Sequence, residues 1–452
     1  MVVREVDRTP FHLKIDGKWV YVSEDVMRNH PGGSAITTYR DKDATTVFHS
    51  FHAGSTEAYK WLTELKGTTT TQPKEQPEDV LIGDDAINMG KFDISAEDAD
   101  KIAKDFDRLR LRVRREGLMD GDIFFYIRKV LESMAMIVLA FYIQDWNWFA
   151  AALLMGLAWQ QLGWQIHEFC HQQMFKNHFY NDLASYFVGN FMQGFSSGGW
   201  KEQHNIHHAA TNVVGRDGDL DLLPLWATVV QDLKLVDSWY LNLLPYQHIY
   251  WTVALPLLRL SWLSQSIAFV STMSNNFYTI YRKRAVYEQT ALAAHWILVL
   301  YQLYCLPDWV TAVKFFLVSQ LFGGFLTAHV VTYNHYSADK FPCFLYIFQD
   351  NSRILTNYPC LQVYTTRNMC PSTFIDWLWG GLNYQAGGSH HMPSCLDHTT
   401  RTDVALVMPL VKDFCAEHKI PYMVDTYFTG WYLGVEQFAN VAKVALKQQL
   451  FN

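Results

Sequence analysis

Residues 167–171 read HEFCH and residues 204–208 read HNIHH, and these two stretches decide how the chain is interpreted. In a helix, side chains three or four positions apart lie on one face, so each stretch would present several imidazoles to one ion. A single HxxxH motif is weak evidence, because buried histidines with ordinary partners are common. Two motifs within 42 residues indicate a metal site. The predicted ligands are His167, His171, His204, His207 and His208.

The composition favours a membrane protein. Charged residues make up 18% of the 452 residues, against about 25% in soluble domains. Trp and Tyr together number 40 (16 + 24), and the net charge of −7 gives no indication of nucleic-acid binding. Seven cysteines without a CxxC pair fit reduced thiols. The first 30 residues contain no secretory signal, so we expect the N-terminus in the cytosol.

Several apolar stretches are candidates for membrane-spanning helices, which need about 20 apolar residues. The four candidates are residues 130–146, 148–166, 290–306 and 309–331. Trp and Tyr flank them, as at membrane interfaces. The apolar segment 249–270 contains Pro256 and Arg259, so we expect it to lie on the membrane. Four crossings return the chain to the cytosol, and the second and fourth then end beside histidines.

The N-terminal part has a different pattern. Residues 1–66 alternate short apolar and polar patches, as a small α+β domain does. Residues 67–94 begin with a run rich in Thr, Pro and acidic side chains, and we interpret them as a linker. An amphipathic helix with a basic face is expected at 95–117, and either an anionic membrane surface or solvent would suit that face. The membrane domain would then be residues 95–452.

The HPGG sequence at residues 30–33 resembles the haem loop of cytochrome b5. His52 follows His30 by 22 positions, where that family has its second axial ligand. Two axial histidines give a closed haem iron that transfers electrons without binding oxygen. His49 is a nearby alternative that matches the family less well, and a degenerate domain without haem is the other interpretation. The resemblance implies a haem b site formed by His30, Pro31, Gly32, Gly33 and His52.

An electron carrier on the same chain narrows the choice of metal. Imidazole suits iron, copper and zinc, but zinc has no use for single electrons. A redox metal that activates oxygen requires single electrons. A substrate that is oxidised at a membrane is most simply a lipid. Removing hydrogens from two adjacent, unactivated carbons points to a pair of irons.

Together these features resemble the front-end fatty acid desaturases, which insert a double bond between an existing one and the carboxyl end. WQQLGW, QHNIHHAATNVVGRDGDLD and FIDWLWGGLNYQ are similar to the nematode delta-5 and delta-6 enzymes, and more closely to the delta-5 type. The resemblance implies two non-haem irons, O2, NADH-cytochrome b5 reductase and a polyunsaturated acyl-CoA or phospholipid substrate. It also implies a multi-pass protein of the endoplasmic reticulum membrane, with the haem domain and histidines in the cytosol.

The expected fold is therefore a small α+β haem domain followed by a mainly α-helical membrane domain, with four transmembrane helices and a cytosolic cap. His335 matches a further iron ligand of the family, and Asn334 beside it could act through water. Carboxylates that could orient imidazoles, or simply form a polar loop, are Glu168, Asp217, Asp219 and Asp221. Histidines interpreted as structural are His248, His295 and His329.

The third histidine motif departs from the family pattern Gln-x-x-His-His. Four residues separate Gln385 from His390 and His391, and two extra positions on a helix rotate side chains by about 200°. If the histidine pair is aligned with the family, both remain ligands with a shifted spacer. If Gln385 is aligned instead, Gly388 and Ser389 occupy the ligand positions.

Other interpretations follow from this irregularity. Residues 342–350 also look inserted relative to the family. This insertion and the irregular third motif could both come from wrongly assigned exon boundaries in the gene, which sequencing the transcript would reveal. A fused sphingolipid desaturase or hydroxylase is a second possibility, although the Gln that opens the third motif argues against it. A non-catalytic membrane haem protein with a broken iron site is a third, and two extra irons per haem would exclude it.

Overall fold

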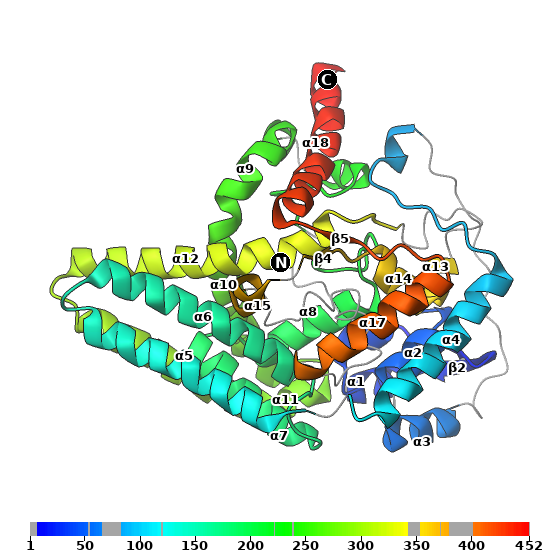
Figure 1. The fold of residues 1–452 in the computed structure, drawn as a ribbon, viewed down its shortest axis with the longest axis horizontal. Coiled ribbons are helices and arrows are strands. Elements are labelled where there is room, and N and C mark those ends of the chain that lie inside the picture. The colour runs from blue at the N-terminus through cyan, green and yellow to red at the C-terminus, as the bar shows by residue number, and fades with distance from the viewer. Residues whose placement is uncertain are drawn as a thin grey trace.

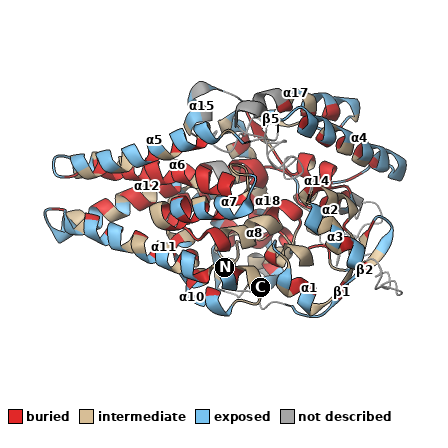
Figure 2. Ribbon diagram, turned by 90° about the horizontal axis from the view of Figure 1, so that it is seen from below, coloured by how far each residue is buried: buried red, intermediate tan, exposed pale blue. Residues whose placement is uncertain are grey.

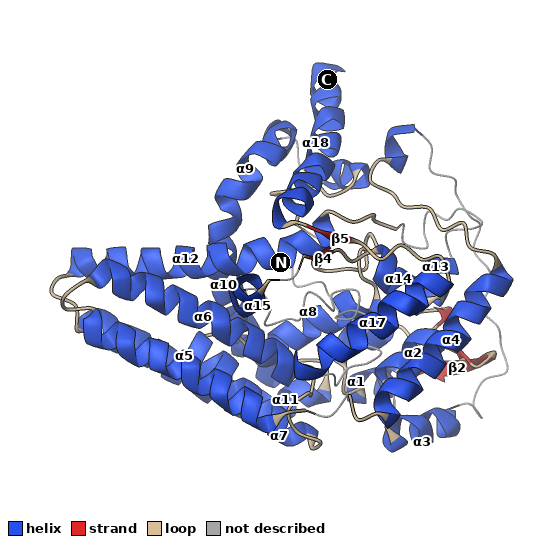
Figure 3. Ribbon diagram, viewed as in Figure 1, coloured by secondary structure: helices blue, strands red, loops and turns tan. Residues whose placement is uncertain are grey.

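A computed structural model of the chain describes residues 7–52, 55–65, 83–118, 121–220, 222–236, 239–341, 353–370, 372–378 and 401–451. The fold is mainly helical, with a small mixed unit at the N-terminal end and long helices that project to one side (Figure 1). Within the described residues, the strands form two small sheets (Figure 3). The predicted positions outside the described residues are Asp221, 342–350, Gln385, His390 and His391.

The N-terminal unit is built on a three-stranded sheet with the order β2-β1-β3. β1 pairs antiparallel with β2 through a turn at Asp16-Gly17, where both residues have positive φ, and parallel with β3. Alternate residues Phe11, Leu13 and Ile15 point into the core, as expected for a half-buried strand. The elements of this unit are β1 (Phe11–Ile15), β2 (Lys18–Val22), α1 (Glu24–Asn29), η1 (Gly33–Thr37), β3 (Lys42–Asp43), α2 (Thr45–Phe51) and α3 (Thr56–Leu65).

Helices make up most of the remaining chain. The first of them are η2 (Gly83–Ala86), α4 (Ala96–Arg115), α5 (Ile123–Ile143), α6 (Trp148–Cys170), α7 (His178–Ser185), the π-helical η3 (Tyr186–Gln193) and α8 (Ser197–Ala209). Those that follow are η4 (Val230–Leu235), η5 (Tyr240–Asn242), η6 (Leu244–Tyr246), α9 (Gln247–Ala254), η7 (Leu255–Leu257), α10 (Leu258–Thr272), η8 (Met273–Asn275), α11 (Thr279–Tyr304) and α12 (Trp309–Tyr336). The C-terminal elements are α13 (Arg353–Thr356), α14 (Tyr358–Tyr364), β4 (Asn368–Met369), α15 (Thr373–Leu378), α17 (Arg401–Glu417), β5 (Val424–Asp425) and α18 (Tyr427–Phe451).

The amphipathic helix expected at 95–117 is present as α4. The Ser95 side chain accepts from the Asp98 N–H and caps its first turn. Its apolar face packs on the protein, where the rings of Phe106 and Phe414 lie 5.8 Å apart. Upstream, the fully buried Phe92 lies in the same core. The last part of the predicted linker therefore packs against the folded protein.

The long helices α5, α6, α11 and α12 project side by side from the rest of the fold (Figures 1 and 2). α6 packs along both α5 and α12, and buried residues line the inner faces of the group (Figure 2). The four predicted stretches lie almost entirely within α5, α6, α11 and α12. Among the described residues, Trp309–Tyr336 and Tyr240–Asn275 are long and apolar enough to cross a membrane. The second contains the segment that we expected to lie on the membrane surface.

Close backbone contact joins α6 to α12. A Cβ added to Gly156 would lie 2.8 Å from the Ser319 carbonyl oxygen and 2.9 Å from the Gly323 nitrogen. Small residues of this kind let membrane helices approach each other. Nearby, the buried Arg259 of α10 donates from Nε to Gln320 Oε1 at 2.8 Å. The close packing of α6 against α12 therefore fixes the position of α6, whose C-terminal end contains His167.

Candidate metal centre

The first two histidine motifs lie at the ends of two helices. α6 ends at Cys170, and His171 is its C-terminal cap, with its N–H bonded to the His167 carbonyl at 3.0 Å. α8 begins after Ser196, whose side chain accepts from the Gly199 N–H. The histidines of the second motif therefore fall in the last two turns of α8, beside the end of α6.

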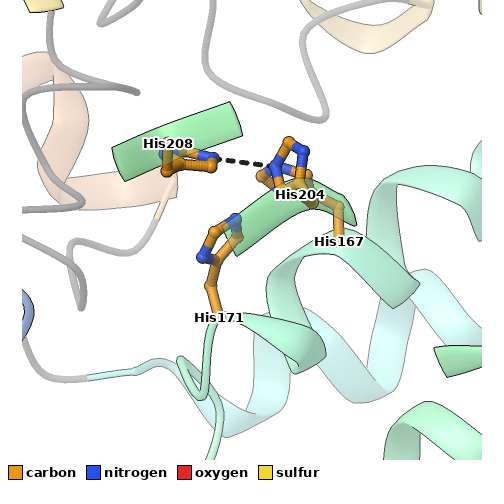
Figure 4. A group of neighbouring side chains, drawn as sticks. All are labelled: His167, His171, His204 and His208. Carbon is orange, nitrogen blue, oxygen red and sulfur yellow. Dashed lines mark hydrogen bonds between the residues drawn. The ribbon is translucent and has the colours of Figure 1, made fainter. Parts of the chain in front are cut away.

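Four of the predicted ligands converge (Figure 4). One nitrogen from each of His167, His171, His204 and His208 lies within 4.8 Å of the others. His204 Nε2 is 3.1 Å from His167 Nε2 and 2.7 Å from His208 Nε2. Histidine nitrogens bind a metal at about 2.0–2.1 Å, so nitrogens sharing one ion lie at most about 4.2 Å apart. The two pairs that His204 forms, at 3.1 Å and 2.7 Å, lie within this limit and fit donors that share a single ion.

A second set of side chains adjoins the first. The ring centroids of His207 and His335 lie 4.7 Å apart, and those of His204 and His207 lie 5.5 Å apart. His207 Nδ1 lies 2.9 Å from Asp217 Oδ2, and His335 Nδ1 lies 3.0 Å from the Thr365 carbonyl oxygen. Hydrogen bonds of this kind fix the orientation of metal-binding imidazoles. Both rings would therefore hold a metal through Nε2.

His204 and His207, one turn apart on α8, have opposite shifts of the imidazole pKa. Burial, followed by the neighbouring imidazoles, lowers the pKa of His204 well below its usual value. Burial alone would lower the pKa of His207, but the carboxylates of Asp217 and Asp219 outweigh it and raise that pKa to about 9. His204 is therefore a neutral donor, whereas His207 must release a proton to bind a cation.

Supporting side chains surround the four-histidine cluster, and the sequence indicated only some of them. The Trp200 ring lies 4.0 Å from the His204 ring, and its place one turn earlier in α8 was a usable signal. Tyr126 donates to Glu168 Oε2 at 2.9 Å, and Glu168 Oε1 lies 3.8 Å from His167 Nδ1. By contrast, no local sequence pattern predicts that α14 lies beside α8, where Gln362 Nε2 donates to the His208 carbonyl oxygen at 3.0 Å.

Histidines that we interpreted as structural lie outside both sets. His295 Nδ1 lies 2.8 Å from the Phe191 carbonyl oxygen, and His329 bonds to the Tyr427 hydroxyl. Both are buried among protein atoms. Asn334 precedes His335, and its buried Oδ1 has no hydrogen-bond partner in the described part of the chain, as a water-linked role would require.

His30 and His52 face each other in the N-terminal unit. Their ring centroids lie 6.1 Å apart with the rings 72° from parallel. One iron held at about 2.0 Å by each ring would separate the centroids by about 6.2 Å, so the pair fits two axial ligands. Burial, with a smaller effect of His52, lowers the pKa of His30 to about 3, which keeps that ring neutral.

The alternative ligand His49 points elsewhere. Its Nε2 lies 2.7 Å from Asp16 Oδ1 and its Nδ1 lies 2.8 Å from the Tyr59 hydroxyl. His52 instead bonds through Nδ1 to the Phe48 carbonyl oxygen at 2.9 Å, so Nε2 is the nitrogen that would bind a metal. The geometry thus favours His52 over His49 as the partner of His30.

An apolar pocket of about 170 Å³ lies between α5, α6, η3 and α11. Met155, Trp159 and Gln302 line it together with His295. None of the predicted metal ligands takes part in its lining, so it is a feature of the helix group and separate from the histidine cluster.

Comparison with known proteins decides the family. Residues 146–426 match the sequence profile of the family described as Fatty acid desaturase, which is more than half of the chain. The chain belongs to the fatty acid desaturase family. Its histidine clusters fit the non-haem di-iron centre that this family implies.

Relatives of this desaturase span its whole length. The Delta(5) fatty acid desaturase fat-4 of Caenorhabditis elegans is 59% identical over 99% of both chains. The Delta(6)-fatty-acid desaturase fat-3 of the same nematode is 44% identical over 98% of both chains. The Delta(8)-fatty-acid desaturase of Euglena gracilis is 32% identical over 94% of both. The desaturase is therefore an oxidoreductase, and the predicted resemblance to nematode delta-5 and delta-6 enzymes is confirmed.

Proposed function

We propose that this desaturase inserts a cis double bond at the delta-5 position of polyunsaturated acyl chains, with delta-6 as the next candidate. The four-histidine cluster beside His207 and His335 carries the proposal, because it brings ligands from three helices to one place. The greater identity to the Delta(5) relative, 59% against 44%, supports the position.

Iron would be held by this chain in two adjoining sites. His167, His171, His204 and His208 would hold one ion, and His207 and His335 would contribute to the other. The ligands expected beyond the described residues are Gln385, His390 and His391. When bound, the two irons would activate O2 to remove hydrogen from adjacent carbons. The net reaction converts –CH2–CH2–, O2, two electrons and two protons to –CH=CH– and two waters.

Electrons would come from NADH-cytochrome b5 reductase through a haem b held by His30 and His52. The 6.1 Å separation of their rings supports this assignment. We place the haem domain at 1–66, a linker at 67–94 and the membrane domain at 95–452. The helices α5, α6, α11 and α12 would cross the endoplasmic reticulum membrane, with the histidine sites on the cytosolic side. The substrate would be an acyl-CoA or a phospholipid.

The test is a lipid profile of yeast that expresses the chain and is fed delta-5 and delta-6 substrate acids. A parallel variant replaces residues 386–389 with Ile-Glu, which restores Gln-Ile-Glu-His-His. A new double bond from the unaltered chain supports the proposal and gives its position. Product from the altered chain alone would show that the irregular third motif prevents the reaction. No product from either chain, with both expressed, would contradict the proposal.

The irregular spacing from Gln385 to His390 favours one alternative, a membrane haem protein without catalytic activity. Metal analysis of the purified chain separates the two functions. Two non-haem irons per haem would exclude the alternative, whereas haem without non-haem iron would support it.

A further inference from the structure

The predicted haem loop lies directly on the helix that carries the second histidine motif. The Ser34 backbone N–H donates to Glu202 Oε2 at 3.3 Å, and the Tyr281 hydroxyl donates to the same oxygen at 2.7 Å. A Cβ on Gly33 would lie only 2.2 Å from that oxygen. Glu202 belongs to α8 and precedes His204 by two residues. One carboxylate therefore touches the haem loop and adjoins a predicted iron ligand.

A second contact fixes the other end of α8. The Tyr39 hydroxyl donates to the Ala209 carbonyl oxygen at 3.0 Å, and both residues are buried. The N-terminal unit thus holds α8 on both sides of its three histidines. The orientation of the haem loop relative to the metal centre is set by two specific hydrogen bonds in addition to apolar packing.

The contact also completes a continuous bonded route between the two sites. Within the loop, the Gly33 N–H donates to the His30 carbonyl at 3.2 Å. From Gly33 the route passes to Ser34, across the hydrogen bond to Glu202, and along the backbone of α8 to His204. Every step is a covalent bond or a hydrogen bond.

We propose that Glu202 is a positioning residue for electron transfer, because it holds the haem loop on α8 and links His30 to His204. The proposal rests on the proposed function, since it requires a haem beside His30. In each transfer one electron would pass from a haem held by His30 and His52, which would be oxidised, to an iron held by His204 and its neighbours, which would be reduced. Two such transfers supply one desaturation, and the reductase replaces each electron from NADH.

Hydrogen–deuterium exchange of the full chain tests the contact without any need for turnover. Glu202→Ala removes the acceptor of two hydrogen bonds, so we expect amides of residues 33–39 to exchange about tenfold faster. Glu64→Ala is the matched control, because this carboxylate is exposed on α3 of the same unit. Unchanged exchange in Glu202→Ala would overturn the docking role.

Stopped-flow absorption of the haem tests the electron-transfer role. In Glu202→Ala, reduction of the haem by the reductase should stay at the wild-type rate. Its reoxidation with acyl substrate and O2 should slow by about tenfold or more, since small misplacements of reacting groups have large effects on rate. Glu202→Gln keeps an acceptor oxygen and should restore much of the reoxidation rate.

The outcomes separate this inference from the proposed function. A wild-type chain that binds no haem, or whose haem is not reoxidised by substrate and O2, would contradict the proposed function. A wild-type chain that works, with Glu202→Ala reoxidised within twofold of it, would overturn the inference alone. If Glu202→Ala fails to fold, Tyr281→Phe decides, because it keeps the ring and removes one hydrogen bond. We expect it to slow reoxidation a few-fold, and an unchanged rate would overturn the inference.

Discussion

Two groups of histidines in this molecule differ in number and spacing, and the difference matches the two roles that we propose for them, carrying electrons and using them. His30 and His52 oppose each other with ring centroids 6.1 Å apart, which suits one iron with both axial positions closed. In the cluster of α6 and α8, the nitrogens of four histidines lie within 4.8 Å of one another. Several donors on one side of an ion leave its other positions for oxygen and substrate.

The two groups also differ in how their rings are oriented. His52 uses a backbone carbonyl of its own helix, at Phe48. His207 uses the side chain of Asp217 and packs against His335 from a distant helix. A two-ligand site can thus be completed within one small unit, whereas the metal centre requires α6, α8 and α12 to come together.

Removing a central ligand should have the largest effect. His204 contacts both His167 and His208, so His204→Ala should lower product by at least about 100-fold. The haem absorption should be unchanged. Product measured by gas chromatography of fed yeast, with metal analysis of the purified chain, checks both expectations. His178→Ala, an exposed histidine of α7, is the control, and equal losses in both variants would contradict the assignment.

Weakening the carboxylate behind His207 should have the next largest effect. Asp217 accepts from the His207 ring and from the Asn212 N–H. Asp217→Asn keeps the size but removes the charge, so iron affinity should fall by about 10–100-fold. Titration of the iron-depleted chain measures it. Iron affinity equal to wild type would show that His207 is not a ligand.

Removing His52, the proposed haem ligand, should leave the non-haem site intact. In His52→Ala the haem absorption should disappear, and product should fall by about tenfold because electrons must come from free carriers. Non-haem iron content should be unchanged. His49→Ala is the control, since His49 bonds to Asp16 and Tyr59, and it should retain haem. Loss of haem in the control with retention in His52→Ala would reverse the ligand assignment.

The smallest effect is expected at Tyr126, which contacts the four-histidine cluster only through Glu168. Tyr126→Phe removes the hydroxyl that donates to Glu168. The free energy of unfolding should fall by about 1 kcal/mol, with product reduced no more than about threefold. Denaturation in detergent measures the first and the yeast profile the second. A loss of product as large as that in His204→Ala would place Glu168 among the metal ligands.

Local patterns in the sequence were enough to predict much of the site. The spacing of His167 and His171 placed both on one helical face, and the resemblance of the N-terminal stretch to cytochrome b5 paired His30 with His52. The long-range contacts could not be predicted in this way. His335 meets His207 only because α12 ends beside α8, and nothing near either residue encodes that meeting.

Element boundaries show the same limit. α5 begins at Ile123, whereas the predicted apolar stretch begins at 130, after the charged residues Arg128 and Lys129. An apolar run locates the part of a helix that suits lipid, and the helix itself continues past it. Phe92 and Asn88 give a second case. Phe92 is buried in the core and the Asn88 side chain donates to the Thr228 carbonyl oxygen, in a segment whose composition suggested a linker.

The contact of Ser34 with Glu202 joins two parts of one polypeptide, and this has a consequence for electron supply. A tethered domain meets its target at an effective concentration in the millimolar range for a short linker, whatever amount of free cytochrome the membrane contains. Tethering also fixes the stoichiometry at one proposed haem for each metal centre. A haem holds one electron, and a desaturation consumes two. Under the proposed function, the reductase would therefore have to recharge the same haem in the middle of every reaction cycle.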